Sequence, residues 1–387
     1  MMRLSLLAVL ALLSPGELLA QAPRTLSVVR DLLIPADKAD LSEAFIIAIS
    51  PRGHIAVPQP GDGHIKVFSP TGAMTTVGRT GEGPGEFRRA NRVGYLGDSL
   101  WALDVGTSRI SLFGPDLKLA RSFAEPFSAM KAMQAPAGVE RPVITFLSQA
   151  VLSNGDLRAV ASWHQGAPRP AWAADVDSGA TLLVRISPLG AYQRRLAVHP
   201  KSRCTISYTV AGGSGSTRIP FCAARVSTDW DATIGIAMVD TPEPRGTNAH
   251  YRVAVIRERG DTLFDRSYPF TAIPVTKGAL DSVEASDAES RKGVPPSFAQ
   301  GMPKPKPEST YPPVRRVVLG RDNTVWLELR TTSGGHRWLV LDPRGNQVGL
   351  VQLPYEVTLR VAERGMFWGV ATDEDGLQGI VRYRVAP

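Results

Sequence analysis

Two similar stretches decide the fold: HIKVFSPTG at His64–Gly72 and RISLFGPDL at Arg109–Leu117. In each, alternating apolar residues run into a turn that contains a proline. The matched pairs, each 45 residues apart, are Ile65 and Ile110, Phe68 and Phe113, and Pro70 and Pro115. Such alternation is typical of β-strands, and a proline fixes φ in the turn between two strands. The 45-residue spacing is close to the length of a four-stranded propeller blade.

The same strand and turn recur along the chain. LLVRISPLG at Leu182–Gly190 and WLVLDPRG at Trp338–Gly345 repeat both, whereas YRVAVIRERG at Tyr251–Gly260 keeps the strand and the glycine without the proline. A further pair of strands precedes these hairpins and is clearest at residues 93–104. We therefore predict blades near residues 45–77, 90–125, 143–198, 220–268, 312–353 and 355–385.

The last of these sets contains only three strands. The stretch TLSVVRDLLI at Thr25–Ile34 precedes the first full blade and can supply the missing strand. A strand borrowed from one terminus closes the ring and leaves only short, protected edges. We predict an all-β fold over residues 24–387, a six-bladed β-propeller of four-stranded antiparallel blades in a single domain. An insertion at residues 271–311 has a helix-compatible composition over 276–293 and, because of its prolines, is expected to be extended beyond. A short helix that caps the channel mouth and a mobile, solvated loop are the two alternatives for its first part.

Residues 1–20 have the layout of a secretory signal peptide, with Arg3, an apolar run over Leu4–Leu13 and a small-residue end. Cleavage is expected after Ala20. The apolar run is shorter than the roughly 20 residues that a membrane span requires, and no later run approaches that length. We predict a secreted or periplasmic protein without a membrane span.

The chain contains two cysteines, Cys204 and Cys222, which bracket two β-prone runs around a glycine-rich turn. In an exported protein such a pair is expected to form a disulfide, here one that fastens a hairpin. Two free buried thiols are the alternative, and metal binding by a lone pair is the weaker one.

The formal net charge of +8 favours anionic partners. For an exported protein these are a protein or an anionic glycan or small molecule, rather than nucleic acid. The same charge is also compatible with no specific partner, and we expect a monomer.

The stretch GRTGEGPGEFRRANRV at Gly78–Val93 is rich in glycine but lacks the Gly-Lys-Ser/Thr of a phosphate loop. With the residues that follow, it resembles an NHL repeat, which has spaced glycines before a phenylalanine, an aspartate at a strand end and an Arg-Ile strand. The matching residues are Gly81, Gly83, Gly85, Phe87, Asp104, Arg109 and Ile110, while Glu86 stands where glutamine is usual. The wider resemblance is to exported, TolB-like six-bladed propellers of bacteria. It implies that Gly78–Val93 is the passage between two blades, and that Asp104 accepts hydrogen bonds from the loop after it.

Long connections between the predicted strands gather on one face of the ring, which makes that face the candidate binding surface. Arginines near the starts of innermost strands are expected at the channel mouth there, where a guanidinium could hold a carboxylate or sulfate. These candidate ligand-binding residues are Arg88, Arg89, Arg92, Arg315 and Arg316. The alternative for the first three is that they are solvated and pair with Glu82 and Glu86.

The resemblance to six-bladed propellers, some of which hold calcium in the central channel, also implies a second hypothesis, a metal-dependent, gluconolactonase-type hydrolase. Oxygen ligands suit this hard cation, and the candidates near strand starts are Glu43, Asn91, Glu140 and Glu356. The six histidines show no metal-binding spacing and no Gly-x-Ser-x-Gly motif is present, so we assign no catalytic residue. We favour a noncatalytic binding or scaffold module without a cofactor.

Overall fold

The computed structural model describes residues 23–126, 144–163, 171–177, 180–210, 213–224, 226–227, 235–241, 249–332 and 334–386. The predicted signal segment and Glu140 lie outside these residues.

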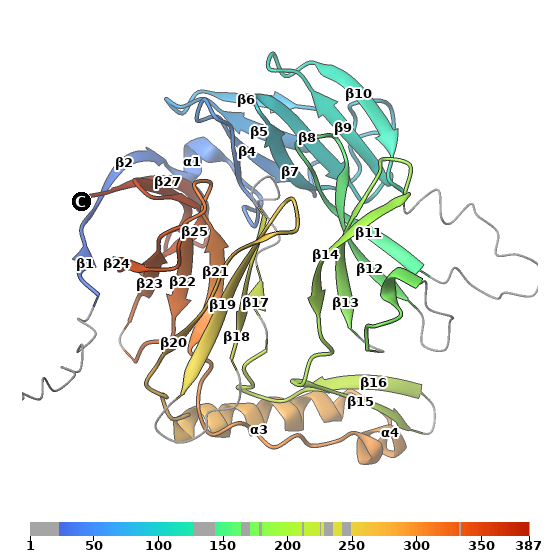
Figure 1. Ribbon diagram of the computed structural model, residues 1–387, viewed down its shortest axis with the longest axis vertical. Coiled ribbons are helices and arrows are strands. Elements are labelled where there is room, and N and C mark those ends of the chain that lie inside the picture. The colour runs from blue at the N-terminus through green and yellow to red at the C-terminus, as the bar shows by residue number, and fades with distance from the viewer. Residues whose placement is uncertain are drawn as a thin grey trace, which may run out of the picture.

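The fold is a six-bladed β-propeller, in which every blade has four antiparallel strands and one blade sheet is extended by a short fifth strand (Figure 1). Blade 1 comprises β3 (Ala48–Ile49), β4 (Ile55–Gln59), β5 (His64–Phe68) and β6 (Met74–Val77). Blade 2 comprises β7 (Ala90–Leu96), β8 (Ser99–Asp104), β9 (Arg109–Phe113) and β10 (Leu119–Ala124). Blade 3 comprises β11 (Ile144–Val151), β12 (Leu157–Trp163), β13 (Thr181–Ile186) and β14 (Tyr192–His199).

The second half of the ring follows the same order. Blade 4 comprises β17 (Val226–Ser227), β18 (Gly235–Asp240), β19 (His250–Arg257) and β20 (Thr262–Pro269). Blade 5 comprises β21 (Val314–Leu319), β22 (Val325–Leu329), β23 (His336–Leu341) and β24 (Gln347–Leu353). Blade 6 comprises β25 (Val357–Glu363), β26 (Met366–Thr372), β27 (Gln378–Val385) and the amino-terminal β2 (Val28–Ile34).

The amino-terminal segment closes the ring, as predicted, but not as one continuous strand. β2 pairs antiparallel with β27 from Val28 to Ile34 and completes blade 6. The two residues of β1 (Thr25–Leu26) instead pair in parallel with β24 of blade 5. The segment therefore crosses from one blade to the next, beside the carboxyl terminus (Figure 1).

The core lies between the blades. Six clusters of buried apolar side chains are described, and each is shared by one blade and the next around the ring. The cluster between blades 6 and 1 joins Ile34 and Trp368 to Ile55 and Phe68, so the ring is also closed by apolar packing. Burial of this kind is the main favourable contribution to folding.

The strand order defines two faces of the ring. The loop-rich face carries the connections from second to third strands and from each blade to the next, and the short-loop face carries the other connections. On the loop-rich side, α1 (Ala36–Ala39) precedes β3, and the 3-10 helix η1 (Ala171–Ala173) lies between β12 and β13.

Two insertions form a layer beside the ring, seen along the lower edge of Figure 1. The hairpin of β15 (Thr205–Val210) and β16 (Gly213–Arg218) lies between β14 and β17. The helices α3 (Lys277–Lys292) and α4 (Pro296–Gly301) lie between β20 and β21. Tyr208 of the hairpin packs edge-on against Phe298 of α4, with ring centroids 6.2 Å apart.

The expectation of a wholly extended chain after residue 293 is wrong, because α4 is helical. Proline occupies its first helical position, where the missing N–H costs no hydrogen bond. The end of α4 is also held by Arg291 of α3, whose guanidinium donates to the carbonyl oxygen of Ala299 at 2.9 Å. Within the described residues, no helix is long and apolar enough to cross a membrane.

Candidate functional site

The glycine-rich stretch at residues 78–93 connects blade 1 to blade 2 on the loop-rich face. Its Phe87 is fully buried and packs against Phe113, with ring centroids 6.0 Å apart. Gly78 has φ +79°, and a Cβ atom there would lie 2.3 Å from the Phe87 ring. The glycine thus allows the chain to turn tightly over a buried aromatic ring.

Asp104 organises the arginines of this connection. Its carboxylate accepts hydrogen bonds from the backbone N–H groups of Arg88, Arg89 and Gly106 and from the hydroxyl of Thr107, at 2.8–2.9 Å. The carboxylate is buried, so these donors replace water. The structural role that the NHL resemblance implied for Asp104 agrees with this geometry.

The side chains of Arg88 and Arg89 are exposed. Arg88 forms an ion pair with Glu82 at a surface where such pairs contribute little to stability. Glu86 pairs with Arg79 rather than with one of the three candidate arginines. Arg92 lies inside β7, where its charge acts on the buried Glu125. Burial raises the pKa of Glu125, and the opposing effects of Ser148 and Arg92 do not cancel this rise.

Four innermost strands carry a β-bulge, and the extra residue is polar in every one. The strand register skips one residue in each of β7, β11, β21 and β25. The skipped residues are Asn91, Gln149, Arg315 and Arg360. Bulges redirect side chains and are common beside functional sites.

The bulge in β21 brings two consecutive arginines to one carboxylate. Arg315 Nη1 lies 3.3 Å from Glu328 Oε1, and Arg316 Nε donates to Glu328 Oε2. Glu328, on the adjacent β22, is 1% exposed. Two neighbours on a regular strand would face opposite sides of the sheet, so the bulge is what allows this shared contact.

His336, at the start of β23, completes the group. Its Nδ1 lies 2.7 Å from Glu328 Oε1, and its Nε2 lies 3.0 Å from the carbonyl oxygen of Tyr355. Both partners are acceptors, so an imidazolium can donate to both at once. Burial works to raise the pKa of Glu328, but Arg316 and His336 outweigh it and hold the pKa below its usual value.

Arg330 adds another guanidinium at this end of the channel. It stacks on the ring of Tyr311 at 4.4 Å, an arrangement that favours a cation. Its Nε is buried without a hydrogen-bond partner among the described residues. Burial and the charge of Arg315 lower the pKa of Arg330. We call Arg315, Arg316, Glu328, Arg330 and His336 the mouth cluster, because they lie at the loop-rich end of blade 5.

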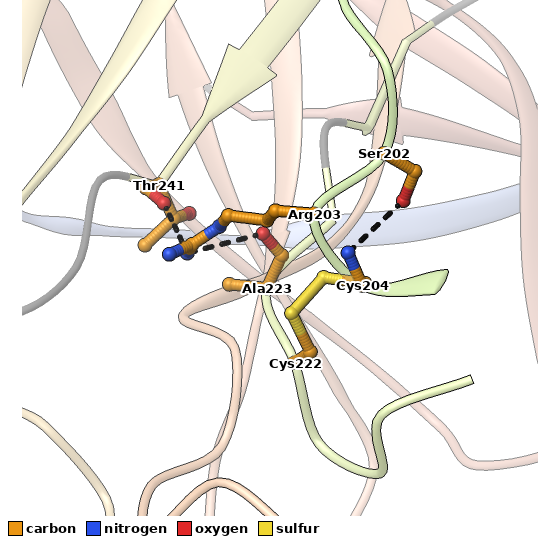
Figure 2. The surroundings of a disulfide bond; sticks show 6 residues. All are labelled: Ser202, Arg203, Cys204, Cys222, Ala223 and Thr241. Carbon is orange, nitrogen blue, oxygen red and sulfur yellow. Dashed lines mark hydrogen bonds between the residues drawn. A yellow bond between two sulfur atoms is a disulfide. The ribbon is translucent and has the colours of Figure 1, made fainter. Parts of the chain in front are cut away.

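The hairpin insertion contacts Tyr311, the residue on which Arg330 stacks, through Phe221. A disulfide joins Cys204, directly before β15, to Cys222, shortly after β16 (Figure 2). The guanidinium of the adjacent Arg203 donates to the carbonyl oxygen of Thr241 at 2.8 Å. Phe221, next to the disulfide, packs edge-on against Tyr311 with centroids 5.2 Å apart. The disulfide therefore fixes a segment that supports the aromatic ring under Arg330.

Three of the four residues proposed for calcium, Glu43, Asn91 and Glu356, lie in the described part of the chain. Asn91 is the bulge residue of β7, and its Oδ1 is buried without a partner there. Glu43 lies before the two-residue β3, and Glu356 is exposed directly before β25. Within the described residues, no three His, Cys, Asp or Glu side chains form a group that could hold a metal ion. Glu140 lies outside this part, so the four-residue site stays a prediction.

The fold places this chain among six-bladed β-propellers. It matches no protein-family model and no curated protein in sequence. Solved structures similar in fold include a protein of Bacteroides fragilis described as exported, at 10% identity and TM-score 0.45, with 94% of this chain and 95% of that one covered. Virginiamycin B lyase of Staphylococcus aureus matches at 11% identity and TM-score 0.38, covering 93% and 99%. A gluconolactonase of Xanthomonas campestris matches at 9% identity and TM-score 0.38, covering 88% and 85%.

Proposed function

We propose that this propeller is a noncatalytic binding module that holds a ligand bearing carboxylate or sulfate groups at its loop-rich mouth. The ligand is a small molecule, a glycan or an acidic segment of a protein. The observation that carries the proposal is the charge imbalance of the mouth cluster. Arg315 and Arg316 pair with the one carboxylate of Glu328, while the buried Nε of Arg330 has no hydrogen-bond partner among the described residues.

The geometry suits an oxyanion rather than a neutral ligand. Glu328 holds Arg316 and Arg315 from the buried side, and nearly half of the Arg315 side chain (45%) remains exposed. Burial without a carboxylate partner disfavours the charged form of Arg330, and a bound anion would restore that form. Guanidinium groups bind carboxylate and sulfate oxygens through two parallel N–H donors.

The test is a titration of the purified protein with sulfate and with citrate at low ionic strength, followed by calorimetry. We expect saturable binding that weakens about tenfold, or roughly 1.4 kcal/mol, when Arg315 or Arg330 is replaced by glutamine. The matched control is Arg344→Gln, which removes the same charge from an exposed turn of the same blade. Equal binding by all variants, or no saturable binding, would overturn the proposal.

The calcium-dependent hydrolase is the second candidate, and the unpartnered Oδ1 of Asn91 favours it. The neighbouring Arg92 raises the electrostatic cost of a dication at that position. Metal analysis of the purified protein and thermal melts in calcium and in chelator separate the two functions. Stoichiometric metal together with a chelator-sensitive lactonase rate would replace the binding proposal.

Export is part of the proposal, since a secreted or periplasmic module meets different ligands from a cytoplasmic one. Cell fractionation and sequencing of the mature amino terminus test it, and we expect cleavage after Ala20. Recovery of the uncleaved chain in the cytoplasm would contradict this part.

A further inference from the structure

A cavity of about 360 Å³ is lined mainly by residues toward the short-loop face, whereas the mouth cluster lies toward the loop-rich face. Its wall includes Pro51, Gly97, Ser153 and Arg321, which lie in the connections between first and second strands of four different blades. These connections belong to the short-loop face. The cavity is therefore distinct from the loop-rich surface that the sequence singled out.

The wall of the cavity combines apolar surface with positive charge. Ile49, Leu96 and Val361 supply aliphatic side chains, and Tyr95 and Trp101 supply aromatic ones. The charged residues of the wall are Arg321 and Arg360, and no aspartate or glutamate lines it among the described residues. A mostly apolar pocket with a few converging polar groups is the usual form of a small-molecule site.

Arg360 is the bulge residue of β25 and has no carboxylate partner among the described residues. Its Nε is buried without an acceptor. Burial and the nearby charge of Arg316 lower the pKa of Arg360 to about 10. A cation in this position is costly unless it is paired, and an anion in the cavity would pair it.

Arg321 can contribute to the same anion. Its Nη1 lies 3.9 Å from the Glu363 carboxylate, and its Nη2 lies 3.4 Å from the carbonyl oxygen of Ser50. Both contacts are long for hydrogen bonds. Because a guanidinium has five N–H donors, Arg321 retains donors for a ligand.

Two buried donors in the wall also lack partners. The Tyr95 hydroxyl and the Trp101 Nε1 have no hydrogen-bond partner among the described residues, although these residues are only 8% and 2% exposed. Unsatisfied buried donors are rare and suggest a ligand, ion or water. Gly94 shapes this wall, since a Cβ there would lie 2.5 Å from the Trp101 indole.

We propose that this cavity binds a small carboxylate with an aromatic or other flat apolar body. The guanidiniums of Arg360 and Arg321 hold the carboxylate, and the body lies against Trp101 and Leu96. Carboxylate chemistry follows from the unpartnered Nε of Arg360 and from Arg321, whose one carboxylate contact, with Glu363, is long. The apolar body follows from the aliphatic and aromatic remainder of the wall.

The experiment compares three probes: 2-naphthoate, its neutral analogue 2-naphthamide, and acetate. Binding to the purified protein is followed by calorimetry and by quenching of tryptophan fluorescence. We expect one naphthoate per chain, bound at least about tenfold more tightly than naphthamide because of the charge, which corresponds to about 1.4 kcal/mol. Acetate, which lacks the apolar body, is expected not to saturate over the same range.

The variants separate this site from the mouth cluster. Arg360→Gln and, independently, Arg321→Gln should each weaken naphthoate binding at least tenfold, and Arg360→Lys should weaken it less. Arg344→Gln is the charge-matched control, and Arg315→Gln should weaken sulfate binding at the mouth without changing naphthoate binding. Thermal melts establish that each variant is folded, and the two independent arginines keep the test valid if one variant is not. Equal affinity for naphthoate and naphthamide, equal binding by the Arg360→Gln and Arg344→Gln proteins, or absence of saturation would overturn the proposal.

Discussion

Glu328 Oε1 and His336 Nδ1 lie 2.7 Å apart, in a place where both residues are almost completely buried. The same carboxylate binds Arg316 through its other oxygen. Burial works to raise the pKa of Glu328, but these donors outweigh it and lower the pKa. Glu328 is therefore ionised in the folded protein at a lower pH than in the unfolded chain.

This relationship predicts how stability depends on pH. A lowered folded pKa contributes stability that is complete above the ordinary value of 4.5 and is lost as the pH falls through the folded pKa. Glu328→Gln should lower the free energy of unfolding at pH 7 by roughly 3 kcal/mol, since it breaks a buried ion pair. The difference from wild type should shrink below pH 4.5. Urea unfolding at several pH values measures it, and parallel pH profiles for the two proteins would contradict it.

For Glu125 we predict the opposite dependence of stability on pH. Burial raises its pKa despite the hydrogen bond from the Ser148 N–H, so the folded protein favours the neutral carboxyl. The stability associated with this neutral form is complete below the ordinary pKa of 4.5 and is lost as the pH rises through the folded value. Glu125→Gln keeps a neutral side chain at every pH. It should raise the thermal midpoint at pH 7 and leave it unchanged in acid, and a lowered midpoint at pH 7 would be inconsistent with this account.

Gly78 lies in the connection between blades 1 and 2. Gly97, in the turn between β7 and β8, also has positive φ and serves as its control. Gly78 has φ +79° and the Phe87 ring 2.3 Å from a Cβ position, while Gly97 has φ +57° and open space around it. Gly97→Ala should cost only the roughly 1–2 kcal/mol of placing a residue with a Cβ in the left-handed backbone conformation. Alanine at Gly78 also displaces a buried ring, so Gly78→Ala should cost at least about 2 kcal/mol more than Gly97→Ala. Chemical denaturation of both variants tests this, and equal costs would refute the packing argument.

The hydrogen bonds of Asp104 allow a prediction of how much stability is lost when a buried acceptor is removed. In Asp104→Asn, an amide nitrogen replaces one of two oxygens that both accept hydrogen bonds, so at least one donor among Arg88, Arg89, Gly106 and Thr107 loses its partner. We expect a loss of about 3 kcal/mol. Asp116→Asn, in an exposed turn of the same blade, is the control and should cost less than about 1 kcal/mol. If both substitutions cost the same, Asp104 does not have the role assigned to it.

The architecture could be predicted because each hairpin carries its own turn chemistry. Pro70 and Pro115 in matching turns indicated a repeat, and the three strands left at the carboxyl end required a fourth from the amino end. The split of that fourth strand at Ser27 could not be predicted. It depends on the pairing of Leu26 with the edge strand β24 of blade 5. A local sequence pattern does not reveal such pairing between distant segments.

The site was predicted less completely. The sequence predicts Arg315 and Arg316 but not Glu328, Arg330 or Arg360. One signal for Glu328 was present, because a glutamate in the apolar strand VWLEL shares a face with Trp326 and so indicates a buried charge. The bulge at Arg360 depends on how β25 pairs with β26, and sequence alternation does not encode it. The cavity at the short-loop end combines residues from five blades, so it became visible only in three dimensions.

The disulfide gives the last prediction. Cys204 and Cys222 lie 18 positions apart in the sequence and enclose the β15–β16 hairpin. Loss of the disulfide should destabilise the enclosed segment by about 3 kcal/mol through the greater freedom of the unfolded chain. The hairpin and the six blades form separate sheets, so the effect of Cys204→Ser with Cys222→Ser should be local. Hydrogen exchange should accelerate in residues 205–218 and at Tyr311, which Phe221 supports, while β7 and β25 exchange as in wild type. Faster exchange in all blades would show instead that the disulfide stabilises the whole ring.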